Sequence, residues 1–330
     1  MKDFKTKLSS IEKDLGLDIP YRYGTARRVS NCWHYSTDGN FKDVIFTDEE
    51  DFKAAMNRIA SLLLKYDVVI LAFCLMDNHV HFVIYGTQEE SLGFMTEFIR
   101  QTSIYISSRH GLRKALRRIP LTQNAIEDEN YLKNVICYNC LNAPVGGLKY
   151  TFYDYPWCSG AVSMRSGSVN LPVWALDIAD DKVMKALGYG RISELTVRDK
   201  EALLISEGIP GDWITYNGWV LPVNYIPVDI VDRIFGSHRA FTFFCSLNKE
   251  KAEDIRNHEG ISGAVRISDA ELRQYKAEKC QAMFGTKSSY SLNVDQRIQL
   301  AKALQRQYLC SYKQIARMVG MRLCDLDKFL

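Results

Sequence analysis

The sequence contains little that would carry the protein into or across a membrane. Its unbroken apolar run, residues 68–76, is nine residues long and too short to span a bilayer. Residues 1–20 alternate charged and apolar side chains and lack the apolar stretch of a signal peptide. We therefore expect a soluble cytoplasmic protein with no membrane partner.

The sequence also lacks the cysteine pattern of a disulfide framework or a zinc finger. Its nine cysteines are scattered, and several fall at positions expected to be buried, which favours reduced thiols. Cys137 and Cys140 have the spacing of a zinc or redox pair, but no second pair follows at the usual spacing. Both lie in one expected helix, and we interpret them as structural.

A large excess of charge of one sign is absent as well. The net charge of +3 does not by itself indicate nucleic acid as a partner. The distribution is more informative, because residues 109–118 are rich in basic side chains and contain no acidic one. Such a run is often only a solvated helix end, but it can also neutralise several phosphates. The candidate DNA-binding residues in this run are Arg109, Arg113, Lys114, Arg117 and Arg118.

The apolar run leads into two histidines, His79 and His81, separated by Val80. A strand points alternate side chains to one face, so both imidazoles face the same way while Val80 faces the core. Two imidazoles held like this can bind one divalent cation. A His-x-His sequence on a strand also occurs by chance in proteins without a metal site.

Tyr138 and Asn142 lie four residues apart in an expected helix. If this helix crosses the histidine face, Tyr138 lies beside the metal and Asn142 can offer its amide oxygen to it. A metal next to a phenol suits phosphodiester cleavage through a covalent tyrosyl intermediate. The alternatives are a tyrosine used for packing and an asparagine that caps a helix.

The pattern along the first half of the chain predicts an α+β fold. Residues 48–66 form an amphipathic helix with Thr47 as its N-cap, and Asp77 and Asn78 form the tight turn of a hairpin. The full set of expected elements is strand 28–35, helix 48–66, strands 68–76 and 79–85, helix 91–108, strand 119–126 and helix 127–142. This βαββαβ order describes a ferredoxin-like antiparallel sheet under two helices.

Residues 28–157 resemble the catalytic domain of the REP-associated tyrosine transposases, single-tyrosine members of the HUH endonuclease superfamily. The matching stretches occur in the order and at the spacings of that family. They are IFTDEEDF (45–52), LMDNHVH (75–81), SRHG (108–111), DENYL (128–132), YNCLN (138–142) and DYPWCS (154–159).

The resemblance implies a role for each residue of the candidate site. His79, His81 and Asn142 would hold Mg²⁺ or Mn²⁺, and Tyr138 would be the nucleophile. The implied activity is metal-dependent nicking and strand transfer of single-stranded DNA through a 5′-phosphotyrosine, as in DNA transposition. The implied partner is single-stranded or hairpin DNA of the REP type, bound by a nucleoid-associated monomer or homodimer. The tyrosine helix could act within its own chain or be exchanged between two chains.

The sequence departs from the family in three places. Asp77 stands where the family has proline, and Ala143 separates Asn142 from the Pro144-Val145 pair that usually follows directly. Residues 117–123 (RRIPLTQ) replace a basic segment before the tyrosine helix. These differences keep open a domesticated protein that binds DNA hairpins without cleaving them. A third alternative is an unrelated hydrolase that activates water with His79 and His81, but it requires additional acidic ligands.

The chain divides into four expected segments. Its 330 residues, 47% hydrophobic and 25% charged, allow more than one ordinary core. The segments are an N-terminal extension (1–25), the catalytic domain (26–160), an accessory region without a catalytic motif (161–289) and a helix-turn-helix-like DNA-binding segment (290–330). We expect the accessory region to support the catalytic domain rather than to contact DNA.

The last segment predicts three helices, at 294–308, 312–319 and 322–330. Gly320 suits the turn between the second and third helices, as in a helix-turn-helix. The third helix carries Asp325 and Asp327, so a purely structural three-helix cap is the alternative. The candidate DNA-binding residues here are Lys313, Arg317 and Arg322.

Overall fold

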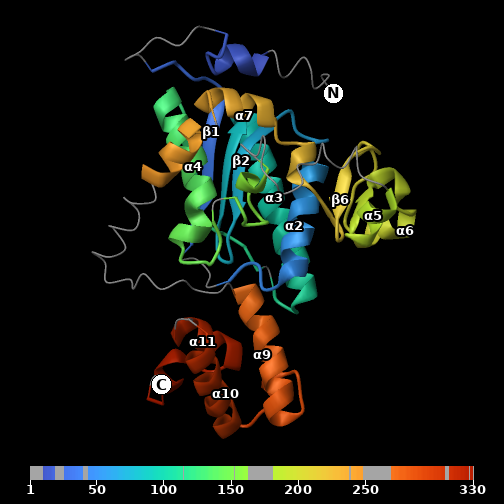
Figure 1. Ribbon diagram of the computed structural model, residues 1–330, viewed down its shortest axis with the longest axis vertical. Helices are drawn as coiled ribbons and strands as arrows, with labels where there is room; N and C mark the ends of the chain where they lie inside the picture. The colour runs from blue at the N-terminus through green and yellow to red at the C-terminus, as the bar shows by residue number, and fades with distance from the viewer. Residues whose placement is uncertain are drawn as a thin grey trace.

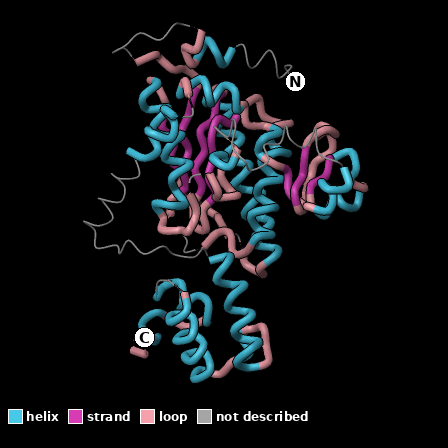
Figure 2. Tube along the Cα trace, viewed as in Figure 1, coloured by secondary structure: helices cyan, strands magenta, loops and turns pink. Residues whose placement is uncertain are grey.

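The computed structural model places an antiparallel sheet with helices packed against it in the first half of the chain (Figures 1 and 2). The residues that it describes are 10–18, 26–39, 44–113, 115–151, 153–162, 181–237, 239–247, 269–308, 312–326 and 328–329. The elements of the first half are β1 (Cys32–Thr37), α2 (Glu49–Leu62), β2 (Val69–Leu75), β3 (Val80–Tyr85), α3 (Gln88–Arg109), β4 (Leu121–Ala125) and α4 (Glu129–Val145). The predicted order of strands and helices is confirmed.

The four strands lie in the order β2-β3-β1-β4, and each pair of neighbours is antiparallel. In the register of β1 with β3, Ser36 lies opposite His81 and His34 lies opposite Val83. The first strand begins at Cys32, later than the predicted start at residue 28. Asn31 adopts a left-handed φ of 52°, which breaks the extended backbone immediately before the strand.

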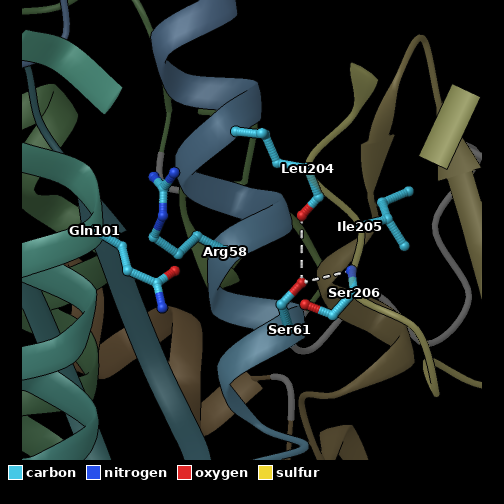
Figure 3. A pocket seen from close by; sticks show the side chains of 6 residues that line it. All are labelled: Arg58, Ser61, Gln101, Leu204, Ile205 and Ser206. Carbon is cyan, nitrogen blue, oxygen red and sulfur yellow. Dashed lines mark hydrogen bonds between the residues drawn. The ribbon is translucent and has the colours of Figure 1, made fainter. Parts of the chain in front are cut away.

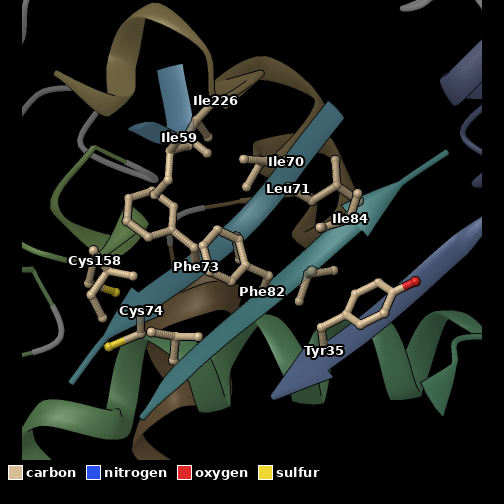
Figure 4. Close-up of a cluster of buried hydrophobic side chains, with 14 of the residues drawn as sticks. Tyr35, Ile59, Ile70, Leu71, Phe73, Cys74, Phe82, Ile84, Cys158 and Ile226 are labelled. Atoms are coloured by element: carbon tan, nitrogen blue, oxygen red, sulfur yellow. The ribbon is translucent and has the colours of Figure 1, made fainter. Parts of the chain in front are cut away.

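The two faces of the sheet are covered by different helices. Phe82 of β3 points to the face covered by α3, where its ring centroid lies 5.3 Å from that of Phe98. Phe73 of β2 lies beside it, with 5.8 Å between the two ring centroids (Figure 4). His81, the residue before Phe82, points to the opposite face and meets Tyr138 of α4. The alternation along β3 therefore separates an apolar core from a histidine face.

Asp48, rather than the predicted Thr47, is the N-cap of α2, and its side chain accepts a hydrogen bond from the backbone N–H of Asp51. Thr47 instead donates its hydroxyl to Asp51 Oδ2 at 2.7 Å and its backbone N–H to the same oxygen at 2.8 Å. Arg109, from the end of α3, places Nη1 2.6 Å from both Asp48 Oδ1 and Asp51 Oδ1. His110 Nε2 lies 3.0 Å from Asp51. These contacts join the start of α2 to the end of α3, and we name Thr47, Asp48, Asp51, Arg109 and His110 the α2–α3 clamp.

Asp51→Asn is expected to lower the free energy of unfolding by about 2–4 kcal/mol, because its carboxylate is fully buried and Arg109 would lose a partner. Burial alone raises the pKa of Asp51, but hydrogen bonds from Thr47, His110 and Arg109 outweigh it and hold the pKa below its ordinary value. The carboxylate therefore contributes stability above an unfolded-state pKa of about 3.9, and this stability is lost as the pH falls through the folded-state pKa.

Urea unfolding of the wild type and Asp51→Asn at pH 7 and at pH 3.5 measures this effect. The difference in the free energy of unfolding between the wild type and Asp51→Asn should be smaller at pH 3.5 than at pH 7. Asp48→Asn is the matched control, because the Asp48 side chain is 37% exposed and should cost less than about 1 kcal/mol. Equal losses in the two variants would contradict the account.

The described part of the accessory region packs against α2 and shares the core of the sheet. Trp219 and Tyr225 belong to that core. Asn57 of α2 donates to the carbonyl of Gly218 at 3.0 Å and accepts from the N–H of Val220 at 2.7 Å. The elements are α5 (Asp181–Ala186), β5 (Tyr189–Arg191), α6 (Val197–Ala202), β6 (Ile214–Tyr216), β7 (Trp219–Val220) and α7 (Val228–Phe235), with β5, β6 and β7 in a second sheet.

The C-terminal region is helical and has a separate core. Its elements are α9 (Asp269–Phe284), α10 (Val294–Gln307), α11 (Tyr312–Val319) and α12 (Leu323–Leu326). Leu272 and Cys280 of α9 are buried together with Leu300 of α10 and Ile315 of α11, so a helix before residue 290 shares this core. The predicted third helix, 322–330, is wrong in length, because α12 ends at Leu326.

The cysteines of the described segments are not joined in disulfides. All eight of them are free, and seven are buried. Cys137 and Cys140 both face the interior from α4. No helix in the described part of the chain is both long enough and apolar enough to cross a membrane.

Candidate active site

The turn between β2 and β3 fixes the two histidines. His79 closes the hairpin, with its carbonyl accepting from the N–H of Met76 at 2.8 Å. The carbonyl of Asp77 accepts from the N–H groups of Ile45 at 2.6 Å and Phe46 at 3.0 Å, which ties the turn to the chain before α2. The ring centroids of His79 and His81 are 4.9 Å apart, with an interplanar angle of 89°. The two imidazoles lie together on one side of β3, as the alternation predicts.

α4 brings the other two predicted residues to the histidines. The ring centroid of Tyr138 lies 5.2 Å from that of His81. Asn142, one turn later, donates Nδ2 to the carbonyl of Tyr138 at 2.9 Å, and its side chain lies near enough to His79 to influence the pKa of that imidazole. Because the helix uses the Asn142 nitrogen, the amide oxygen is the atom left available to a cation. One chain therefore supplies all four residues, although their chemical roles are still predictions.

The ring of Tyr138 contacts His81, whereas its hydroxyl has no partner among the described residues. The side chain is 47% exposed, and its hydroxyl makes no hydrogen bond to any described residue. Partial burial raises the pKa of Tyr138 above its ordinary value, so the phenol is protonated at neutral pH. An accessible phenol beside two imidazoles is an arrangement in which a substrate could reach its oxygen.

Two further side chains orient the imidazoles. His79 Nδ1 lies 2.7 Å from Asn78 Oδ1, so we assign the ring proton to Nδ1. His81 Nδ1 lies 3.3 Å from Nε2 of His34, and these two rings stack at 18°. In both histidines the Nδ1 atom therefore has a protein partner, which leaves Nε2 as the atom that can bind a metal. Sequence reasoning missed His34, because the pairing of β1 with β3 brings it to His81 from 47 residues away.

Burial keeps all three imidazoles neutral. It lowers the pKa of His34 to about 4. It also lowers the pKa of His79, with partial opposition from the nearby Asn142 side chain. The pKa of His81 is held well below its ordinary value, because burial is reinforced by the neighbouring His79 and His34. Neutral imidazole is the form that binds a metal, so the site is ready for a cation at neutral pH.

The donor set fits a divalent cation with two nitrogen ligands and one amide oxygen. Within the described ranges, no group of three or more His, Cys, Asp or Glu side chains is arranged to hold a metal ion. A metal here therefore requires Asn142 as its third protein ligand. The same finding weighs against the hydrolase alternative, which needs acidic ligands next to His79 and His81.

His34→Phe should weaken Mn²⁺ binding by about 10–100-fold, because it removes the partner that orients the His81 ring while retaining a stacked aromatic. Isothermal titration with Mn²⁺ measures the affinity. Trp33→Phe is the matched control, since Trp33 is the neighbouring residue in β1 and faces the other side of the sheet. Unchanged affinity in His34→Phe would show that His34 does not support the site.

The predicted DNA-binding residues of the basic run differ in exposure and in their contacts. Arg113, Arg117 and Arg118 are exposed and make no ion pair with any described residue, and the last two lie just before β4. Arg109 is part of the α2–α3 clamp, where its guanidinium forms ion pairs with Asp48 and Asp51.

The described C-terminal candidates also differ from one another. Arg322 pairs with Asp325 at 2.7 Å, and Arg317 is half-buried. Lys114 and the Lys313 side chain lie outside the described residues.

The histidine face is open toward β4. Thr122 and Asn124 lie opposite Ser36 and His34 in the register of β4 with β1, so all four share the face of His81. Thr122 and Asn124 are exposed, whereas α4 contacts β2 and β3. A polar and accessible strip therefore runs from the histidines to the edge strand.

Comparisons with known proteins give one distant likeness. No protein-family model matches the sequence, and no curated protein matches it. The solved structure of a REP-associated tyrosine transposase bound to a REP hairpin is similar to half of this chain. The identity is 13% and the TM-score is 0.31, over 49% of this chain and 93% of that chain. A likeness of this size carries no inference about activity, which has to rest on the residues of the site.

Proposed function

We propose that this protein nicks and rejoins single-stranded DNA through Tyr138, with a divalent cation held by His79, His81 and Asn142. The observation that carries the proposal is the position of the Tyr138 ring, 5.2 Å from His81 in a residue that is 47% exposed. The neutral state of the two histidines and the free oxygen of Asn142 support a metal at the same point. Bound Mg²⁺ or Mn²⁺ would polarise the scissile phosphate and neutralise its charge.

The chemistry of the chain itself is a phosphoryl transfer to tyrosine. The Tyr138 hydroxyl gives up its proton, and its oxygen forms a bond to the phosphorus. The bond between phosphorus and the 3′ oxygen breaks, and that oxygen takes a proton and becomes a free 3′-OH. The 5′ end of the DNA stays on the enzyme as a phosphotyrosine ester. A 3′-OH from another strand can reverse the step, so no nucleotide triphosphate is required.

The proposed substrate is single-stranded or hairpin DNA of the REP type. α4 covers only part of the sheet face that carries the histidines. An extended DNA strand could therefore run past the histidines, over Ser36 and Thr122, toward β4. The exposed Arg117 and Arg118 lie at the start of this strand and can neutralise phosphates. The phenol must lose a proton to react, and its raised pKa makes this loss a costly part of the reaction.

The test incubates the full-length protein with end-labelled hairpin DNA, in Mn²⁺ or in EDTA, and separates the products on a denaturing protein gel. The proposal predicts a labelled protein–DNA adduct that forms only with the metal. Shifted mobility on a native gel without any adduct would replace the proposal with the alternative of a hairpin-binding protein without cleavage activity. Loss of both signals would exclude DNA of this type as the ligand.

A further inference from the structure

A pocket whose lining includes no residue of the histidine site lies where the sheet domain meets the accessory region. It has a volume of about 240 Å³ and is bordered by α2, α3 and the loop after α6 (Figure 3). Ser61 of α2 accepts from the N–H of Ser206 at 3.2 Å and donates to the carbonyl of Leu204 at 3.4 Å, which holds the loop at the rim. The volume is below the usual range for drug-sized ligands, so the pocket suits a small group.

Arg58 lines this pocket and is only 6% exposed. Its sole hydrogen bond among the described residues joins Nη1 to Thr102 Oγ1 at 3.5 Å, which is long. The guanidinium also lies 5.5 Å from the ring centroid of Tyr105. No carboxylate of a described residue pairs with it. Most of its five N–H donors therefore lack a strong acceptor within the described residues.

Among the described residues, Lys133 is buried and Arg27 partly buried, and both have a carboxylate partner. Arg27 and Lys133 both contact Glu129, at 2.9 Å and 2.6 Å. A buried cation is costly unless an anion accompanies it. Burial accordingly lowers the pKa of Arg58 to about 10, yet the group stays charged at neutral pH. Arg58 differs from these two cations because it lines a pocket and has no carboxylate partner among the described residues.

The acid nearest to the pocket wall along α3 is already engaged. Glu97 lies 2.6 Å from Arg100 and accepts from Gln101, another lining residue, at 2.8 Å. Its pKa is lowered to about 2, first by the hydrogen bond from Arg100. Its charge is therefore balanced by Arg100 and does not pair with Arg58. Ser61 and Gln101 add polar groups to the wall.

We propose that the Arg58 pocket is a binding site for a phosphate group, separate from the Tyr138 site. The guanidinium would pair with two phosphate oxygens, the geometry for which arginine is suited. The phosphate can belong to a free phosphate or small phosphoester, or to the backbone of DNA that extends beyond the Tyr138 site. The site does not depend on the proposed nicking activity, since Arg58 takes no part in that chemistry.

The test measures the melting temperature of the full-length protein in sodium phosphate and in sodium chloride of equal ionic strength. We expect phosphate to raise the melting temperature of the wild type by about 2–4 °C over chloride. Arg58→Met should lose this rise. In chloride it should melt at or above the wild-type temperature, because it removes an unpaired buried charge while retaining the bulk of the side chain. Arg100→Gln, which removes an exposed charge outside the pocket, is the control and should keep the phosphate response.

A second arm separates the two sources of phosphate. If the rise in melting temperature caused by phosphate disappears when a single-stranded oligonucleotide is bound, the occupant is the phosphate of the DNA backbone. An effect that persists beside the oligonucleotide indicates a free phosphate or small phosphoester. Equal phosphate responses in the wild type and Arg58→Met would overturn the proposal, as would the absence of any response in the wild type.

Discussion

Tyr138→Phe is expected to abolish the covalent protein–DNA adduct and to lower the rate of strand cleavage by at least about 10³-fold. The substitution removes one oxygen, and that oxygen makes no hydrogen bond to any described residue. The phenyl ring can keep the edge contact with His81. Stability should therefore change by less than about 0.5 kcal/mol, which separates a chemical effect from a folding effect.

Tyr131→Phe provides the matched control for this prediction. Tyr131 lies on the same helix, two turns earlier, and is half-buried. Its variant should form the adduct at the wild-type rate. Cleavage is followed on labelled single-stranded DNA in Mn²⁺, and stability by thermal unfolding. An adduct that survives in Tyr138→Phe would show that a different residue attacks the phosphate.

His81→Gln is expected to weaken Mn²⁺ binding by at least about 10²-fold and to remove metal-dependent cleavage. The site has only three candidate protein ligands, and His81 is one of its two imidazoles. Glutamine keeps a polar group next to His34, which limits the cost of changing a side chain that is 7% exposed. The measurement is a titration with Mn²⁺, followed by the cleavage assay over a range of metal concentrations.

His79→Gln tests the same site from the other ligand. It should reduce Mn²⁺ affinity about as much as His81→Gln does, because the two imidazoles lie next to each other and would bind the same ion. Tyr138→Phe serves as the control here and should bind Mn²⁺ as the wild type does. Full Mn²⁺ affinity in both histidine variants would contradict the proposed metal site.

Local patterns in the sequence predicted the parts of the site that depend on local geometry. The alternation of a strand places His79 and His81 on one face, and the spacing of a helix places Asn142 one turn after Tyr138. The apolar run before the histidines predicted the buried strand β2. Each of these relations spans only a few residues, so no pairing between distant segments was needed to infer it.

Contacts between distant segments could not be predicted in the same way. His34 reaches His81 only through the register of β1 with β3. Arg109 was predicted to bind DNA from its place in a basic run, but its partners Asp48 and Asp51 lie 61 and 58 residues earlier in the chain. The Arg58 pocket forms where α2 meets a loop of the accessory region, which has no motif. In each case a tertiary contact determines what the side chain does.

The most direct test of the central claim is to identify the residue that carries the DNA. After reaction in Mn²⁺ and digestion with nuclease and trypsin, mass spectrometry locates the nucleotide-bearing peptide. We predict peptide 134–149, in which Tyr138 is the only tyrosine. A nucleotide found on any other peptide, or hairpin DNA cleaved without a covalent intermediate, would contradict the assignment of Tyr138 as the nucleophile.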